Sequence, residues 1–142
     1  MLQRVGLLSR FVLLAAVLMG LGCAKSDPPA DFAKAKADKF YEALQQQNVD
    51  EALTYCSPKR TKDEWRSVLE HARNKLGTVT SFQFKRQEVN TTLRGRFFIF
   101  EYQVEYSGGK RAAETLTLFH KVDEEGTYIV SYKISAEGYS SI

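Results

Sequence analysis

The hydrophobic pattern of this chain changes its period once, at Gly77, and this change limits the fold more than any other feature. Before Gly77 the apolar residues recur at helical spacing, and after it they alternate while aromatic and β-branched residues become frequent. A chain whose helices all precede its strands is expected to form an α+β domain. The 142 residues suffice for one core of ordinary size and leave no room for a second domain.

Three helices are predicted before Gly77. Their apolar stripes run from Ala33 to Leu44, from Val49 to Cys56 and from Trp65 to Leu76. The second and third helices begin with capping boxes, in which Asn48 is followed by Glu51 and Thr61 by Glu64. The glycine at position 77 is expected to end the third helix.

Four strands are predicted after the helices, over residues 79–88, 93–106, 110–122 and 127–136. Short connections, including a tight turn at Gly108 and Gly109, imply that consecutive strands pair as an antiparallel meander. Strands of ten or more residues have to curve around the helical layer. The predicted fold is therefore a set of N-terminal helices packed on a curved four-stranded antiparallel sheet.

The N-terminus has the order of an export signal. Arg4 and Arg10 precede an uncharged apolar run, 11–22, that ends in small residues directly before Cys23. The run is short for a membrane span, which needs roughly 20 apolar residues. An uncleaved anchor and an ordinary secretory signal are the two alternatives to a lipoprotein signal. The stretch resembles a bacterial lipobox, although Gly20 stands where that pattern usually has Leu.

The resemblance implies that the chain is cut before Cys23 and that this cysteine carries several fatty chains, which together anchor a protein firmly. The predicted organisation is a lipoprotein signal peptide over 1–22, a lipidated tether over 23–30 and a single domain over 31–142. Ala24, rather than Asp, resembles the signal for delivery to the outer membrane. The protein is thus expected on the bacterial cell envelope, anchored by palmitate-type lipid and facing the periplasm.

Charge and cysteine content exclude several classes of function. The net charge of +3 falls to about +1 without Arg4 and Arg10, and no basic face is available for nucleic acid. With Cys23 lipidated, Cys56 is the only thiol left, and its helical spacing makes it a core residue rather than a nucleophile. Neither metal-ligand spacing nor a glycine-rich phosphate loop occurs, so no metal or cofactor is predicted.

A polar site is conceivable on the third strand. Glu114 and His120 alternate in phase with the core positions of residues 110–122, and Tyr132 on the next strand is a candidate third member. Such a site would form a pocket between sheet and helices for a small molecule or a reaction. The competing interpretation pairs Glu114 with Arg96 or Arg111 across the sheet. The protein is predicted not to be an enzyme.

The second strand contains four large apolar residues in succession, 97–100. Alternation sends Phe98 and Phe100 to one face and Phe97 and Ile99 to the other, so both faces are expected to be covered. The helices cover one face. The other is a candidate interface for a second copy or a protein partner through Phe97 and Ile99, or is covered by long neighbouring side chains.

Several stretches together resemble the bacterial family known as domain of unknown function 4019. They comprise Trp65, Arg73, Leu76, Gly77 and Val79; Arg96 and Phe97 to Tyr102; Glu114 to Thr117; and Tyr128 to Ile134. The resemblance implies an envelope setting and a cystatin-like or nuclear transport factor 2-like fold, in which a curved sheet wraps over helices. It implies no activity. The function expected from the sequence is that of a lipid-anchored periplasmic binding or assembly module, with a ligand or enzyme pocket at Glu114 and His120 as the alternative.

Overall fold

A computed structural model describes residues 28–141. The signal peptide predicted over 1–22 and the lipidation site at Cys23 lie outside the described residues, as does most of the predicted tether. Within the described part, three helices precede a five-stranded antiparallel sheet. No helix among these residues is long and apolar enough to cross a membrane.

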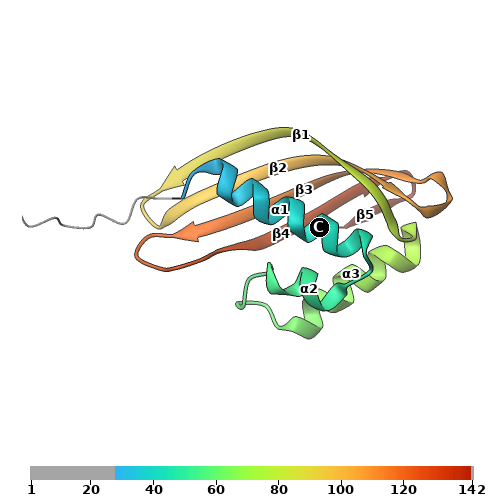
Figure 1. Ribbon diagram of the computed structural model, residues 1–142, viewed down its shortest axis with the longest axis horizontal. Helices are drawn as coiled ribbons and strands as arrows, with labels where there is room; N and C mark the ends of the chain where they lie inside the picture. Colours follow the sequence, from blue (N-terminus) through green and yellow to red (C-terminus); the bar gives the residue numbers. More distant parts are fainter. Residues whose placement is uncertain (1–27, 142) are drawn as a thin grey trace, which may run out of the picture.

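The helices form where the capping and spacing patterns predict them. They are α1 (Ala30–Gln45), α2 (Val49–Thr54) and α3 (Lys62–Leu76). The side chain of Asn48 accepts a hydrogen bond from the Glu51 amide, and Thr61 and Glu64 form a complete capping box. Helix α1 lies across one face of the sheet, whose strands curve over it (Figure 1).

The sheet has one strand more than the sequence predicts. Its strands are β1 (Val79–Thr92), β2 (Gly95–Tyr106), β3 (Arg111–Lys121), β4 (Thr127–Ala136) and β5 (Tyr139–Ser141), and their order in the sheet follows the chain. The prediction of four strands was wrong because β5 has only three residues, too few to show alternation. β5 pairs only with the last residues of β4.

Strand β4 changes its phase in the middle. Leu118 of β3 pairs with Ile129, but the preceding Thr117 pairs with Ser131, so that Val130 is an extra residue in β4. Strict alternation along residues 127–136 predicts that Tyr128, Val130, Tyr132 and Ile134 share one face, and the extra residue makes that prediction wrong. Tyr128 is exposed, whereas Tyr132 and Ile134 are buried beneath the helices.

The core lies between the helices and the inner face of the sheet. Strand β2 contributes Phe98, Phe100 and Val104 to this face, and α1 contributes Ala33, Ala37 and Phe40. The backbone of the segment that follows α2 hydrogen-bonds to both backbone groups of Ile129, and β5 covers the other half of β4. These contacts pair an edge that would otherwise be free to join another strand.

Candidate functional site

Glu114 is a buried carboxylate held by three tyrosines, and these four residues are called the Glu114 cluster below. Glu114 is 1% exposed. The hydroxyls of Tyr41 and Tyr132 donate to its Oε2 over 2.9 and 2.8 Å, and the hydroxyl of Tyr106 donates to its Oε1. Both carboxylate oxygens are thus occupied by protein donors.

Burial is the main influence on the pKa of the Glu114 carboxyl group. It raises the pKa of Glu114 to about 7, while the hydrogen bonds from the three tyrosines act in the opposite direction. The pKa values of Tyr41 and Tyr132 are raised well above the ordinary tyrosine value by burial and by the neighbouring carboxylate. Glu114 can therefore change its charge near neutral pH, but its burial keeps a ligand from reaching it.

The cluster joins one helix to three neighbouring strands. Tyr41 comes from α1, Tyr106 from β2, Glu114 from β3 and Tyr132 from β4. Sequence reasoning found Glu114 and Tyr132 but missed Tyr41 and Tyr106. The signal was present, because both tyrosines occupy core-facing positions of their elements, and a buried tyrosine hydroxyl needs a polar partner.

A second tyrosine–carboxylate contact lies beside the cluster. The Tyr102 hydroxyl donates to Asp38 over 2.6 Å, and Lys34 donates to the other oxygen of Asp38 over the same distance. The rings of Tyr41 and Tyr102 lie 4.6 Å apart. Helix α1 is therefore joined to the sheet by polar contacts at two of its residues, Asp38 and Tyr41.

The structure does not bring His120 to Glu114. The two residues are six positions apart on β3, which corresponds to about 20 Å along the strand. The Nδ1 atom of His120 instead lies 2.9 Å from the carbonyl oxygen of Gly126 and 3.2 Å from the Thr127 hydroxyl. The ion pair considered with Arg111 is also not formed, since Arg111 binds Glu105 on the outer face over 2.9 Å.

Two recesses adjoin Tyr132. The one that also touches Tyr106 has a volume of about 30 Å³, the size of one water molecule. The other, about 270 Å³, is a groove of mixed polarity between α3 and the strands β4 and β5, lined by Arg60 and His71 among others. Neither recess is lined by Glu114 or His120, so neither matches the predicted pocket.

Cys56 is a core residue, as its spacing predicts. The residue is 6% exposed, and its Sγ lies 3.7 Å from the carbonyl oxygen of Ala52. Burial raises the pKa of the thiol to about 12, which keeps it protonated and unreactive at neutral pH. Across residues 28–141, no group of three or more His, Cys, Asp or Glu side chains is arranged to hold a metal ion.

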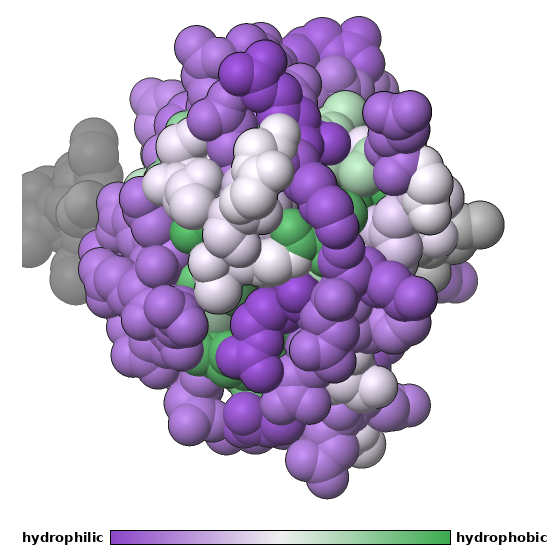
Figure 2. Space-filling model, turned by 90° about the vertical axis from the view of Figure 1, so that its right-hand side faces the viewer, coloured by the Kyte–Doolittle hydropathy of each residue, from purple (hydrophilic) through white to green (hydrophobic). Residues whose placement is uncertain are grey.

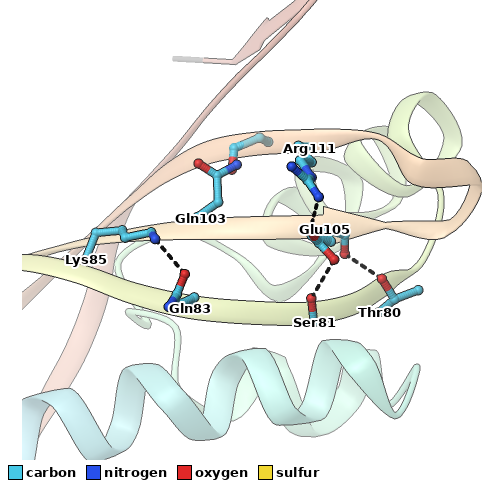
Figure 3. Close-up of polar contacts among 8 residues, drawn as sticks. Thr80, Ser81, Gln83, Lys85, Gln103, Glu105 and Arg111 are labelled. Carbon is cyan, nitrogen blue, oxygen red and sulfur yellow. Dashed lines mark hydrogen bonds and ion pairs between the residues drawn. The ribbon is translucent and has the colours of Figure 1, made fainter.

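The outer face of the sheet, opposite α1, is polar in the half that borders the β2–β3 turn. Glu105 accepts a hydrogen bond from Ser81 over 3.1 Å and pairs with Arg111, and Lys85 donates to Gln83 (Figure 3). These polar side chains satisfy one another, in the case of Glu105 with partners on both neighbouring strands. This half of the face is therefore covered by its own side chains.

The other half of the outer face carries an apolar patch, bordered by Glu88 and Asn90 of β1. Phe97 on β2 lies opposite Phe119 on β3, with ring centroids 4.4 Å apart. Ile99 follows Phe97 on the same face, and Tyr128 on β4 pairs with Phe119. We call Phe97, Ile99, Phe119 and Tyr128 the outer aromatic patch. The first three of these residues are partly exposed, and Tyr128 is 36% exposed. The sequence predicted Phe97 and Ile99 here but not Phe119 or Tyr128.

Comparison with family models gives one match. The model described as "Protein of unknown function (DUF4019)" matches residues 35–132, which is more than half of the chain. This segment extends from α1 into β4 and includes every residue of the Glu114 cluster and of the outer aromatic patch. A search of curated proteins found no match.

Comparison with solved structures finds a similar fold. The chain is similar to the structure of Bd1075 from Bdellovibrio bacteriovorus, with a TM-score of 0.52 and 10% sequence identity. The similarity covers 75% of this chain and 40% of that chain, so the matched part spans about two fifths of its structural neighbour. At this identity the similarity concerns the fold alone.

Proposed function

This chain belongs to the DUF4019 family of proteins of unknown function, and we propose that it is a lipid-anchored, non-catalytic binding module of the bacterial envelope. In this proposal Cys23 bears the lipid, the domain faces the periplasm, and the outer aromatic patch binds another protein. The observation on which the proposal rests is the pair of rings of Phe97 and Phe119 on the face opposite α1. We also propose that the domain is of the cystatin-like or nuclear transport factor 2-like type.

The shape of the outer face favours protein binding over small-molecule binding. The patch lies on a sheet surface, and the recess beside Phe119 and Tyr128 has a volume of about 70 Å³. A drug-sized ligand needs a concave site of at least about 300 Å³. Aromatic side chains on an open surface are instead typical of the centre of protein interfaces.

The Glu114 cluster supports the non-catalytic part of the proposal. A general base has to reach the proton that it removes, and the carboxylate of Glu114 is enclosed with both oxygens bonded to tyrosines. His120 lies at the other end of β3. The alternative function, a pocket that uses both residues, therefore has less support than surface binding.

Lipid attachment is tested by metabolic labelling with radioactive palmitate. We expect the full-length chain to incorporate the label and the Cys23→Ala variant not to incorporate it. Mass spectrometry of the purified protein should find Cys23 at the N-terminus with its acyl groups. An unlabelled protein that begins at Met1 would contradict the anchoring.

Binding through the outer aromatic patch is tested by cross-linking in intact cells. A specific cross-linked product should form with the wild-type chain and disappear in the variants Phe97→Asp and Ile99→Asp. The matched control is Gln83→Asp, which places the same charge on the polar half of the face and should leave the product unchanged. Circular dichroism of each variant verifies folding. If the wild type and the three variants give the same amount of cross-linked product, this patch is not the interface. A product of twice the chain mass would identify the partner as a second copy.

A further inference from the structure

Four of the five exposed large apolar residues of the described domain lie in segments at one end, and the fifth, Val89, lies in the last part of β1, which leads to that end. Phe32 lies in the first turn of α1, Leu93 lies in the β1–β2 turn, Val122 follows β3, and Tyr128 is near the start of β4. Leu93 is fully exposed, and the other three are between 36% and 48% exposed. We call these four residues the N-terminal end surface; it borders the outer aromatic patch at Tyr128, which belongs to both.

Contacts join the segments of this surface in two pairs. The amide of Val122 donates to the carbonyl oxygen of Arg94, which joins the β3–β4 turn to the β1–β2 turn. The ammonium of Lys36 lies 5.2 Å from the ring of Phe32 and 5.6 Å from the ring of Tyr128. Figure 1 shows the start of α1 at the same end as both turns.

The opposite end of the domain has a more hydrophilic surface. It carries the β2–β3 turn, and its surface is mostly hydrophilic, with apolar residues visible only in small recesses (Figure 2). The turn itself consists of Ser107, Gly108 and Gly109. Exposed apolar surface is thus not a general property of the loops of this protein.

The length of the chain before α1 indicates what the N-terminal end surface meets. Only a short segment separates Cys23 from Ala30, and even fully extended it spans at most about 25 Å. If Cys23 is lipidated, as the proposed function requires, the start of α1 cannot lie farther than this from the bilayer. The apolar end then faces the membrane, and the hydrophilic end points away from it.

We propose that the N-terminal end surface rests in the interface of the bilayer that anchors Cys23, with Leu93 and Val122 placed among the lipid head groups. Charges at this end are mixed, since Arg94 and Lys36 are accompanied by Asp123 and Glu124. Burial of apolar side chains therefore drives the contact, and the basic side chains can extend toward the head groups. The domain stands on the membrane with the outer aromatic patch close to the lipid surface.

The test uses the lipidated full-length chain in vesicles of phosphatidylethanolamine and phosphatidylglycerol. An environment-sensitive fluorophore is attached at Leu93→Cys, and a matched control carries it at Glu137→Cys in the exposed turn at the opposite end. Cys56 is buried and does not compete for the label. We expect blue-shifted emission at position 93 with severalfold stronger quenching by spin-labelled lipid than at position 137, at both low and high salt.

Four results would overturn the inference, and they separate it from the proposed function. Water-like emission at position 93, with lipid found on Cys23 by mass spectrometry, rejects the membrane contact while anchoring stands. Blue-shifted emission without lipid quenching means that a protein covers this end. Quenching that disappears at high salt means that electrostatic attraction, and not burial of apolar side chains, holds this end of the domain on the membrane. Absence of lipid on Cys23 rejects both the anchoring and this inference.

Discussion

The hydroxyl of Tyr41 on helix α1 donates a hydrogen bond of 2.9 Å to the carboxylate of Glu114 on strand β3, across 73 positions of sequence. This contact joins the helical layer to the centre of the sheet. It also places an ionisable group in the core, where its charge affects stability.

The Glu114 cluster should make folding stability fall as the pH rises. The folded pKa of about 7 exceeds the value of 4.5 taken for an unperturbed glutamate, so between these values the folded chain binds more protons than the unfolded chain. The contribution of Glu114 is complete below about pH 4.5 and is lost as the pH rises through 7, with a total change of about 3 kcal/mol. Urea unfolding at a series of pH values measures this change in the free energy of unfolding.

The matched variant for this prediction is Glu114→Gln, which keeps the shape of the side chain and removes its charge. The difference in unfolding free energy between wild type and variant should change with pH over the interval from 4.5 to 7. A difference that stays constant with pH would mean that Glu114 has the same pKa in both states.

Removing one donor of the cluster should destabilise the domain. Tyr132→Phe deletes the hydroxyl that donates to Oε2 of Glu114 over 2.8 Å and is expected to cost about 1–2 kcal/mol. The loss should be larger at pH 8 than at pH 5, because an ionised carboxylate depends more on its donors. Urea unfolding of this variant alone and combined with Glu114→Gln gives the coupling energy. Additive losses would show that the two groups do not interact.

Gly95, at the start of β2, should not tolerate a side chain. Its φ is +151°, and a Cβ atom placed there would lie 2.2 Å from the carbonyl oxygen of His120. We expect Gly95→Ala to lower the unfolding free energy by about 2 kcal/mol or more. Gly108→Ala is the control, since a Cβ there meets no atom within 4 Å. Thermal unfolding measures the stability of both variants. Equal losses of unfolding free energy would mean that the close approach to His120 has no effect.

Cys56 should react with a thiol reagent only after unfolding. Burial and a pKa of about 12 leave almost no accessible thiolate at pH 8. In the native protein, modification of Cys56 should be far slower than that of an exposed cysteine introduced by Leu93→Cys, and urea should make the two rates equal. Rapid native modification of Cys56 would show that the segment after α2 opens from β4.

The helices and most of the sheet could be predicted because their signals are local. The capping box of Thr61 and Glu64 and the change of period at Gly77 each depend on residues a few positions apart. Two features of the sheet could not be predicted in this way. The extra residue at Val130 reverses the faces of β4, and β5 forms only because β4 offers it a partner.

The sites were predictable only in part. The apolar run in β2 predicted that Phe97 and Ile99 share a face, but the contact with Phe119 depends on the register between β2 and β3. Likewise the phase of β3 predicted that Glu114 and His120 lie on one face. The distance between them along an extended strand keeps them apart.

The sequence by itself determined the order of helices and strands, the buried faces of the helices and of β2 and β3, and the family to which the chain belongs, because periodicity and capping act over short distances. Only the tertiary structure decided that three tyrosines from three different elements meet one carboxylate, and that four of the five exposed large apolar residues lie at the end where α1 begins. The physical reason is that both arrangements depend on how the sheet curves over α1. That curvature results from the packing of all the elements together and is not encoded in any one of them.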